Sequence, residues 1–172
     1  MEQKDFLIYC DGNITKVLEE LVVEGSLDLR YSDITELPKR LVVGGDLYLC
    51  DTKITQLPGG LTVGECLDLC NTKINQPPED LTVSGYLDLS DISITELPRG
   101  LKIESSLNLC GTGFTRLPED LTVGGNLYLS HTSITKLSED LTVGGSIILD
   151  DTKITQSDID KVISIKNIEL TR

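Results

Sequence analysis

Four of the five cysteines stand at equivalent places in a periodic sequence, and thiols are the side chains here best suited to covalent or metal chemistry. Cys10, Cys50, Cys70 and Cys110 are separated by multiples of twenty residues. If the chain stacks at that interval, Cys50 and Cys70 lie on adjacent coils at a separation compatible with a disulfide. Without a Cys-x-x-Cys pair, and with His131 as the single histidine, the thiols make a poor zinc tetrahedron. We therefore predict a ladder of free thiols, with no metal and no cofactor.

Catalytic motifs are missing from the sequence. It contains no Gly-x-Ser-x-Gly element, no phosphate-binding loop and no Cys–His arrangement, so no nucleophile has an evident base. This favours a non-enzymatic protein. The alternative is an enzyme whose activity depends on His131 or on a cysteine.

The chain is strongly acidic, with a formal net charge of −13. Proteins that bind nucleic acids directly show clustered Lys and Arg, so we expect no such binding. Acidic pairs recur at Glu79-Asp80, Glu119-Asp120 and Glu139-Asp140, and their plain role is solubility. The alternative is a DNA mimic that occupies the basic groove of a nucleic-acid-binding protein. Basic residues that interrupt the negative surface, such as Lys39-Arg40, weaken this alternative.

A repeat of twenty residues positions all these side chains. It runs without insertion from residue 21 to residue 155 and is clearest in two aliphatic columns. The columns are Leu27, Leu47, Leu67, Leu87, Leu107, Leu127 and Ile147, followed by Leu29, Leu49, Leu69, Leu89, Leu109, Leu129 and Leu149. A fixed period of this length is typical of a solenoid.

Each repeat contains two short extended segments. In Leu47-Tyr48-Leu49 both leucines point one way and the tyrosine points the other, because side chains alternate along a strand. Leu41-x-Val43 alternates likewise, and Gly44-Gly45 form a corner between the two segments. One coil cannot cover its own apolar faces, so the coils must stack and pair their strands. The pattern predicts a β-rich parallel solenoid of about eight coils, with little helix except at its ends.

The whole chain is predicted to be a single repeat domain, with regular repeats over residues 23–155 between two caps. Residues 1–22 form the first cap, with a strand over residues 6–9 and helix-like spacing over residues 14–21. Residues 156–172 form the second, where Ser157 or Asp158 caps a short helix that continues through Ile163. A last strand is expected over residues 168–170, and such ends protect exposed sheet edges.

The run Leu47-x-Leu49-x-x-Thr52-x-Ile54-x-x-Leu57-Pro58 resembles the leucine-rich repeat family. Its length and Leu-Pro step are similar to the short bacterial subtype found in secreted effectors, and we expect no counterpart of their separate ubiquitin-ligase domain in these residues. The resemblance implies a bacterial or phage protein that binds a partner protein. Thr replaces the family's Asn in most repeats, and Ile92 replaces it in one. Both a curved horseshoe and a flatter solenoid with strands on two sides fit this pattern.

The resemblance also implies a binding face formed by outward residues between the paired leucines. These residues mix carboxylates with tyrosines, which protein interfaces favour. The candidate partner-binding residues are Tyr48, Tyr86, Tyr128, Asp28, Asp68, Asp88 and Asn108. The alternative is a merely solvated strand face, on which tyrosine stands because it suits strands.

The sequence predicts a cytoplasmic protein without a membrane partner. No apolar run approaches the roughly 18 residues that span a bilayer. Residues 1–5 are not followed by the long apolar stretch of a secretory signal. The odd number of cysteines fits a reducing compartment. Secretion as an effector is the alternative.

Overall fold

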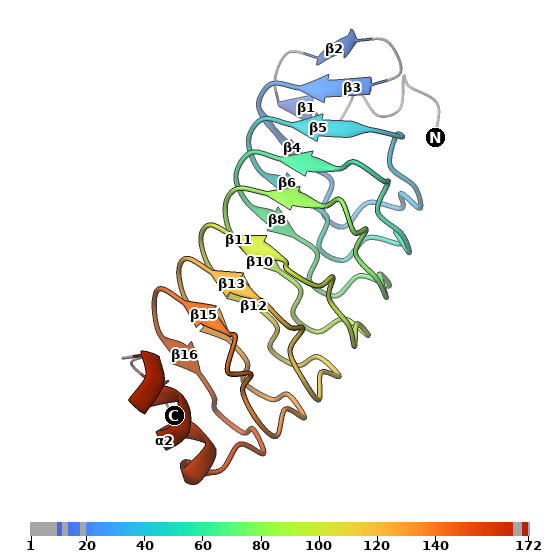
Figure 1. Ribbon diagram of the computed structural model, residues 1–172. Helices are drawn as coiled ribbons and strands as arrows, with labels where there is room; N and C mark the ends of the chain where they lie inside the picture. The colour runs from blue at the N-terminus through green and yellow to red at the C-terminus, as the bar shows by residue number, and fades with distance from the viewer. Residues whose placement is uncertain (1–9, 12–13, 18–19, 167–169, 172) are drawn as a thin grey trace.

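The computed structural model describes residues 10–11, 14–17, 20–166 and 170–171, and these form a stack of similar coils (Figure 1). Each regular coil carries two short strands, one on each side of the stack. The predicted parallel β-solenoid is therefore confirmed, in the form with strands on two sides. It has about six turns of about twenty residues, fewer than the eight expected, because both ends depart from the regular coil.

One side of the stack is a sheet of nine strands, called the continuous sheet below. In spatial order they are β1 (Cys10–Asp11), β4 (Ser26–Asp28), β6 (Leu47–Tyr48), β8 (Leu67–Asp68), β10 (Leu87–Asp88), β12 (Leu107–Asn108), β14 (Leu127–Tyr128), β16 (Ile147–Ile148) and β17 (Leu170–Thr171). From β4 to β16 each residue pairs in parallel with the residue one repeat later, as Leu47 does with Leu67. β17 continues the sheet by pairing Leu170 with Ile147.

The opposite side consists of two separate sheets. The first contains β2 (Ile14–Val17), β3 (Glu20–Val23), β5 (Leu41–Val43), β7 (Thr62–Val63) and β9 (Thr82–Val83). The second contains β11 (Lys102–Ile103), β13 (Thr122–Val123) and β15 (Thr142–Val143). Within the described residues, no strand pairing joins β9 to β11, although their coils are consecutive.

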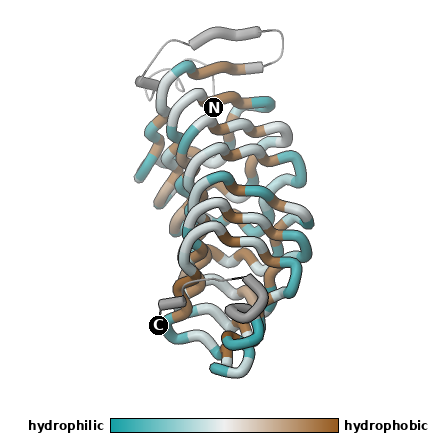
Figure 2. Tube along the Cα trace, turned by 60° about the vertical axis from the view of Figure 1, so that its left-hand side comes forward, coloured by the Kyte–Doolittle hydropathy of each residue, from teal (hydrophilic) through white to brown (hydrophobic). Residues whose placement is uncertain are grey.

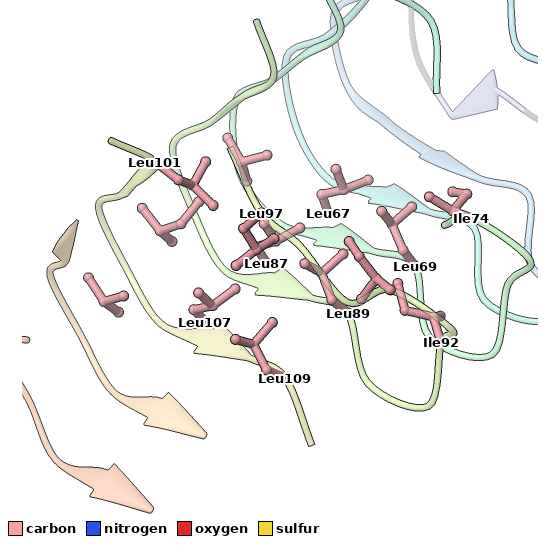
Figure 3. Packing of buried hydrophobic residues seen from close by; sticks show 14 of the residues in the cluster. Leu67, Leu69, Ile74, Leu87, Leu89, Ile92, Leu97, Leu101, Leu107 and Leu109 are labelled. Carbon is pink, nitrogen blue, oxygen red and sulfur yellow. The ribbon is translucent and has the colours of Figure 1, made fainter. Parts of the chain in front are cut away.

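The core lies between the two sides of the stack. Leu67, Leu87 and Leu107 follow one another from coil to coil, beside the parallel column that contains Leu69 and Leu89 (Figure 3), and all are fully buried. Hydrophobic stretches recur at equivalent places in successive coils, and hydrophilic stretches gather at the corners (Figure 2). The predicted inward columns are thus confirmed.

A ladder of buried threonines stands where the leucine-rich repeat has asparagine. The Oγ1 of Thr52 donates to the Leu49 carbonyl at 2.8 Å, and Thr72 donates to Leu69 at the same distance. This bond satisfies both groups inside the coil, where an unpaired polar atom would be costly. Ile92 lacks a hydroxyl and instead packs within the hydrophobic core.

The turn after each strand of the continuous sheet from β4 to β16 contains one residue in the left-handed region. These residues, with φ between 52° and 68°, are Tyr31, Asp51, Asn71, Asp91, Gly111, His131 and Asp151. Asp, Asn and Gly tolerate this conformation better than most residues, which explains why they predominate at this position. The turn redirects the chain away from the sheet in every coil.

The first end differs from the prediction. Residues 14–17 form strand β2, which pairs antiparallel with β3 through Ile14 and Val23, and the helix expected over residues 14–21 is wrong. β-Branched residues favour strands, and an added strand covers the edge of β3. The strand predicted over residues 6–9 lies outside the described residues.

The second end contains helix α2 (Gln156–Lys166), which is longer than the predicted helix. It is capped by Thr155 rather than by Ser157 or Asp158, because the Thr155 Oγ1 accepts a 3.3 Å hydrogen bond from the Asp158 N–H. The final strand includes Leu170 as predicted and continues to Thr171, and the predicted residues 168 and 169 lie outside the described residues. No helix of the described residues has the length and apolarity needed to cross a membrane.

The interruption between β9 and β11 coincides with the one corner of the regular coils that lacks glycine. A Cβ added to Gly64 would overlap the Gly44 carbonyl oxygen of the preceding coil, and one added to Gly124 would overlap the carbonyl of Glu104. The coil that contains β11 has Glu104 and Ser105 at its corner and is the one regular coil with no glycine at either position. Because both of its corner residues carry a Cβ, we expect its backbone to lie farther from the preceding coil than the other coils do.

Backbone hydrogen bonds show the consequence. The Thr82 N–H donates to the Leu61 carbonyl, and the Thr122 N–H donates to the Leu101 carbonyl. Among the described residues, the equivalent bond from the Lys102 N–H to the Leu81 carbonyl is absent. Leu81 is partly exposed, whereas its equivalent Leu61 is fully buried. A cleft of about 330 Å³ opens between the two coils. The continuous sheet still joins them on the other side.

Candidate functional site

The seven predicted partner-binding residues all lie on the outward side of the continuous sheet. We call this surface the tyrosine face and define it by Asp28, Tyr48, Asp68, Asp88, Asn108 and Tyr128, together with Tyr86 and Asp46 in the column that precedes them. Parallel pairing places Tyr48 between Asp28 and Asp68, and Asp88 beside Asn108. Except for the exposed Asp28, these side chains are half-buried.

At its first end the face is organised by Arg30. The guanidinium donates to both carboxylate oxygens of Asp28, at 2.9 and 2.6 Å, and lies 4.8 Å from the centre of the Tyr48 ring. This contact combines an ion pair with a cation–π interaction. Hydrogen bonding and charge from Arg30 lower the pKa of Asp28, so its carboxylate stays ionised.

Asp46 fixes the hydroxyl of the first tyrosine. Tyr48 donates to the Asp46 Oδ2 at 2.9 Å, and the Asp46 Oδ1 accepts the Cys66 N–H of the next coil at 2.9 Å. The backbone hydrogen bond from Cys66 is the main reason that the pKa of Asp46 is lowered. The hydrogen bond to Asp46 in turn raises the pKa of Tyr48, which remains a neutral donor.

A second network surrounds Tyr86 in the middle of the face. The Tyr86 hydroxyl donates to the Asp88 Oδ2 at 2.9 Å, and the Asn108 amide donates to both Asp88 oxygens at 3.2 and 3.1 Å. Ser90 donates to Asp88 through its N–H and its hydroxyl, at 2.8 and 2.6 Å. Burial raises the pKa of Tyr86, so this hydroxyl also remains protonated.

Tyr128 completes the set and is held in a similar way. Its hydroxyl oxygen accepts a 3.2 Å hydrogen bond from the Asn126 amide. All three tyrosines therefore contact a polar residue two positions away in their own coil. Tyr48 and Tyr128 stand four coils apart in one column, or about 19 Å at roughly 4.8 Å per strand. Fixed rings at fixed spacing form a preorganised surface, which lowers the entropy cost of binding.

The structure corrects the predicted free-thiol ladder. Cys50 and Cys70 form a disulfide between adjacent coils, with their Cα atoms 4.8 Å apart. Cys66 and Cys110 are free thiols, and burial raises the pKa of both. Parallel register explains the difference, because Cys110 has serines at the equivalent positions of its neighbouring coils, whereas Cys50 has Cys70. The side chain of Cys10 lies outside the described residues.

The partner-binding residues predicted from the sequence did not include Asp46 of the face or Arg30, which contacts it. The signals were present, since Arg30 follows Asp28 at the same-face spacing of two and Asp46 precedes Tyr48 at that spacing. The acidic pairs lie at exposed corners outside the tyrosine face. One of these pairs is partly neutralised, because Glu119 forms an ion pair with Arg99 of the preceding coil.

Comparison of the sequence with models of known protein families finds no match, and comparison with curated proteins also finds none. The architecture therefore rests on the structure. The fold and the face define a parallel β-solenoid repeat protein with coils of about twenty residues, compatible with a leucine-rich-repeat-like fold.

Proposed function

We propose that this protein binds a partner protein through the tyrosine face and catalyses no reaction of its own. The observation that carries the proposal is the set of three half-buried tyrosines, each held by a hydrogen bond on one uninterrupted sheet. Tyrosine and arginine are the residues on which interfaces concentrate their binding energy. Arg30 against the Tyr48 ring adds the second of these types to the same surface.

The charges of the face favour a partner with hydrogen-bond donors. Asp28 is neutralised by Arg30, and Asp88 already accepts hydrogen bonds within the face, whereas Asp68 presents its carboxylate oxygens between the tyrosines. Lys, Arg or amide groups of a partner would pair with these oxygens while its apolar groups cover the rings. Because the chain as a whole is acidic, encounter with a basic surface would also be accelerated.

We also propose a family, an origin and a cellular location for this protein. The repeated Leu-x-Leu-x-x-Thr-x-Ile-x-x-Leu-Pro unit supports membership of the short leucine-rich repeats of bacteria, and with it a bacterial or phage origin. We place the protein in the cytoplasm, where the described free thiols Cys66 and Cys110 would stay reduced and the Cys50–Cys70 disulfide would be open to reduction.

A second candidate function is mimicry of nucleic acid. The exposed acidic pairs at residues 79–80, 119–120 and 139–140 favour it, because they recur at the same corner of different coils. Ionic strength separates the two functions. Mimicry would weaken steeply as salt rises, whereas binding centred on tyrosines would change little.

The test begins with affinity capture from the native host, followed by calorimetry with the purified partner. Replacing Tyr48 and Tyr128 together with Ala should weaken binding by at least about 2 kcal/mol, roughly thirtyfold, while the far-ultraviolet circular dichroism stays unchanged. Tyr31→Ala is the matched control, because Tyr31 is 77% exposed in the turn beyond the face. Undiminished binding by the folded double variant would refute the proposal.

A further inference from the structure

The disulfide lies beside a carboxylate of the same sheet. Cys50 and Cys70 follow β6 and β8, and Asp68 lies in β8 two residues before Cys70, on the same outward side. The two Sγ atoms and a carboxylate oxygen of Asp68 all lie within 4.8 Å of one another. In the described part of the chain, this is the one cluster that brings three such ligand atoms together.

We infer that Cys50 and Cys70, once reduced, form with Asp68 a binding site for a thiophilic divalent cation of the Zn²⁺ class. Two thiolates and a carboxylate are ligands that Zn²⁺ accepts, and a water molecule would complete its tetrahedron. This inference concerns a different ligand from the proposed function and does not depend on it. It also revises the sequence-based expectation that the thiols form no metal site.

Reduction and metal binding balance as two separate steps. A phosphine reductant takes the oxygen of one water molecule to become a phosphine oxide, and its two electrons with the two protons of that water convert the Cys50–Cys70 disulfide to two thiols. The cation then displaces both thiol protons and bonds to the two sulfur atoms. Because an ordinary thiol has a pKa of about 8.5, binding near pH 7 should release about two protons per ion.

The electrostatics around Asp68 favour a cation. The carboxylates of Asp51 and Asp88 lie near Asp68, whose Oδ1 accepts a 3.0 Å hydrogen bond from the Cys70 N–H. Asp51 also approaches the sulfur, with its Oδ2 3.4 Å from the Cys50 Sγ. A divalent ion between the sulfur atoms and Asp68 would relieve this repulsion, since an opposite charge stabilises the ionised carboxylate.

The chain supplies its own matched control. Cys110 occupies the same place in its coil as Cys50 and Cys70, but Ser90 and Ser130 stand at the equivalent positions on either side. It is a half-buried free thiol of similar surroundings without a second sulfur beside it. A cation that merely bound cysteine would respond to loss of Cys110, whereas the inferred site would not.

The test titrates the full chain with Co²⁺ as a spectroscopic probe, and then with Zn²⁺ as a competitor, after anaerobic reduction by a phosphine. We expect one ion per chain, a sulfur-to-cobalt charge-transfer band, and release of about two protons. Cys50→Ser and Cys70→Ser should abolish the band. Asp68→Asn should weaken binding by at least about 10-fold. Cys110→Ser should leave both band and affinity unchanged.

The oxidised wild-type protein serves as a second control. It should give no charge-transfer band, because both sulfur atoms are held in the disulfide. The inference is overturned if the reduced wild-type chain binds Co²⁺ no more tightly than the oxidised chain. A band that disappears with Cys110→Ser would also overturn it, and so would an affinity unaffected by Asp68→Asn. Circular dichroism of each variant confirms that the solenoid remains folded.

Discussion

Glycines introduced at one corner should close the gap between the two sheets on the interrupted side. In the double variant Glu104→Gly, Ser105→Gly, the obstructing Cβ atoms are removed and the coil regains the corner of its neighbours. Three backbone hydrogen bonds can then form, from residues 102, 104 and 105 to the carbonyls of Leu81, Val83 and Gly85. Their equivalents one coil earlier measure 3.1, 3.1 and 3.0 Å.

The expected gain follows from these bonds. A buried backbone hydrogen bond contributes about 0.5–1.5 kcal/mol, so the three together contribute about 1.5–4.5 kcal/mol. Each new glycine costs about 0.5–1 kcal/mol in conformational entropy. Leu81, now partly exposed, would become buried like Leu61. We expect the free energy of unfolding to rise by about 1–3 kcal/mol, and the melting temperature by about 2–4 °C per kcal/mol.

Amide hydrogen exchange reports the closure residue by residue. The amides of residues 102, 104 and 105 should exchange at least about tenfold more slowly in the double variant, because each would be protected by a new bond. The reciprocal variant Gly124→Glu, Gly125→Ser places the same two residues at an intact corner. It should expose the amides of residues 122, 124 and 125 and destabilise the chain. If neither pair of substitutions changes exchange at its own corner, the glycine explanation of the gap is wrong.

Four single substitutions test the core and the tyrosine face by urea denaturation. Leu89→Ala should cost about 2–5 kcal/mol, because Leu89 is fully buried. Thr72→Val should cost about 0.5–1.5 kcal/mol through its lost bond to the Leu69 carbonyl. Asp46→Ala should cost about 1–3 kcal/mol at pH 7, since the Tyr48 hydroxyl and Cys66 N–H lose their acceptor. Asp68→Asn should instead stabilise the chain at pH 7, because the pKa of Asp68 is raised.

The two aspartates should respond to pH in opposite ways. The lowered pKa of Asp46 gives stability that is present above its unfolded value of about 3.9 and is lost as pH falls through the folded value. The penalty from Asp68 instead appears as pH rises from about 3.9 through its raised folded pKa. If the difference in unfolding free energy between each variant and the wild-type chain stays constant from pH 3 to pH 7, the lowered pKa of Asp46 and the raised pKa of Asp68 are both contradicted.

Near-zero loss in Leu89→Ala would mean that the inward column is misplaced. An unchanged free energy of unfolding in Thr72→Val would show that the hydrogen bond from the Thr72 hydroxyl stabilises the folded chain no more than the bonds to water that it replaces. The neighbouring coil provides context for the second result, because Ile92 already occupies the equivalent position without such a bond.

The tyrosine face shows how far alternation along a strand can predict a surface. Tyr48 between two inward leucines had to point outward, and equal spacing placed Asp68 and Tyr128 in the same column. The bonds of Arg30 to Asp28 and of Tyr48 to Asp46 were less accessible to sequence reasoning. A polar side chain on a sheet can reach neighbours in its own coil or in either adjacent coil, and side-chain conformation selects among them.

The sequence by itself determined the repeat, the inward columns and the outward face, because an unbroken period of twenty residues imposes one register on every coil. Only the tertiary structure decided how closely neighbouring coils approach. That spacing brought Cys50 and Cys70 into a disulfide and separated β9 from β11 at Glu104. The tertiary structure also made residues 14–17 a strand, because the open edge of β3 offers backbone hydrogen-bond partners. The helix-like spacing of the apolar residues there did not outweigh this pairing. Periodicity is a property of the chain, whereas contact between coils depends on atoms far apart in the sequence.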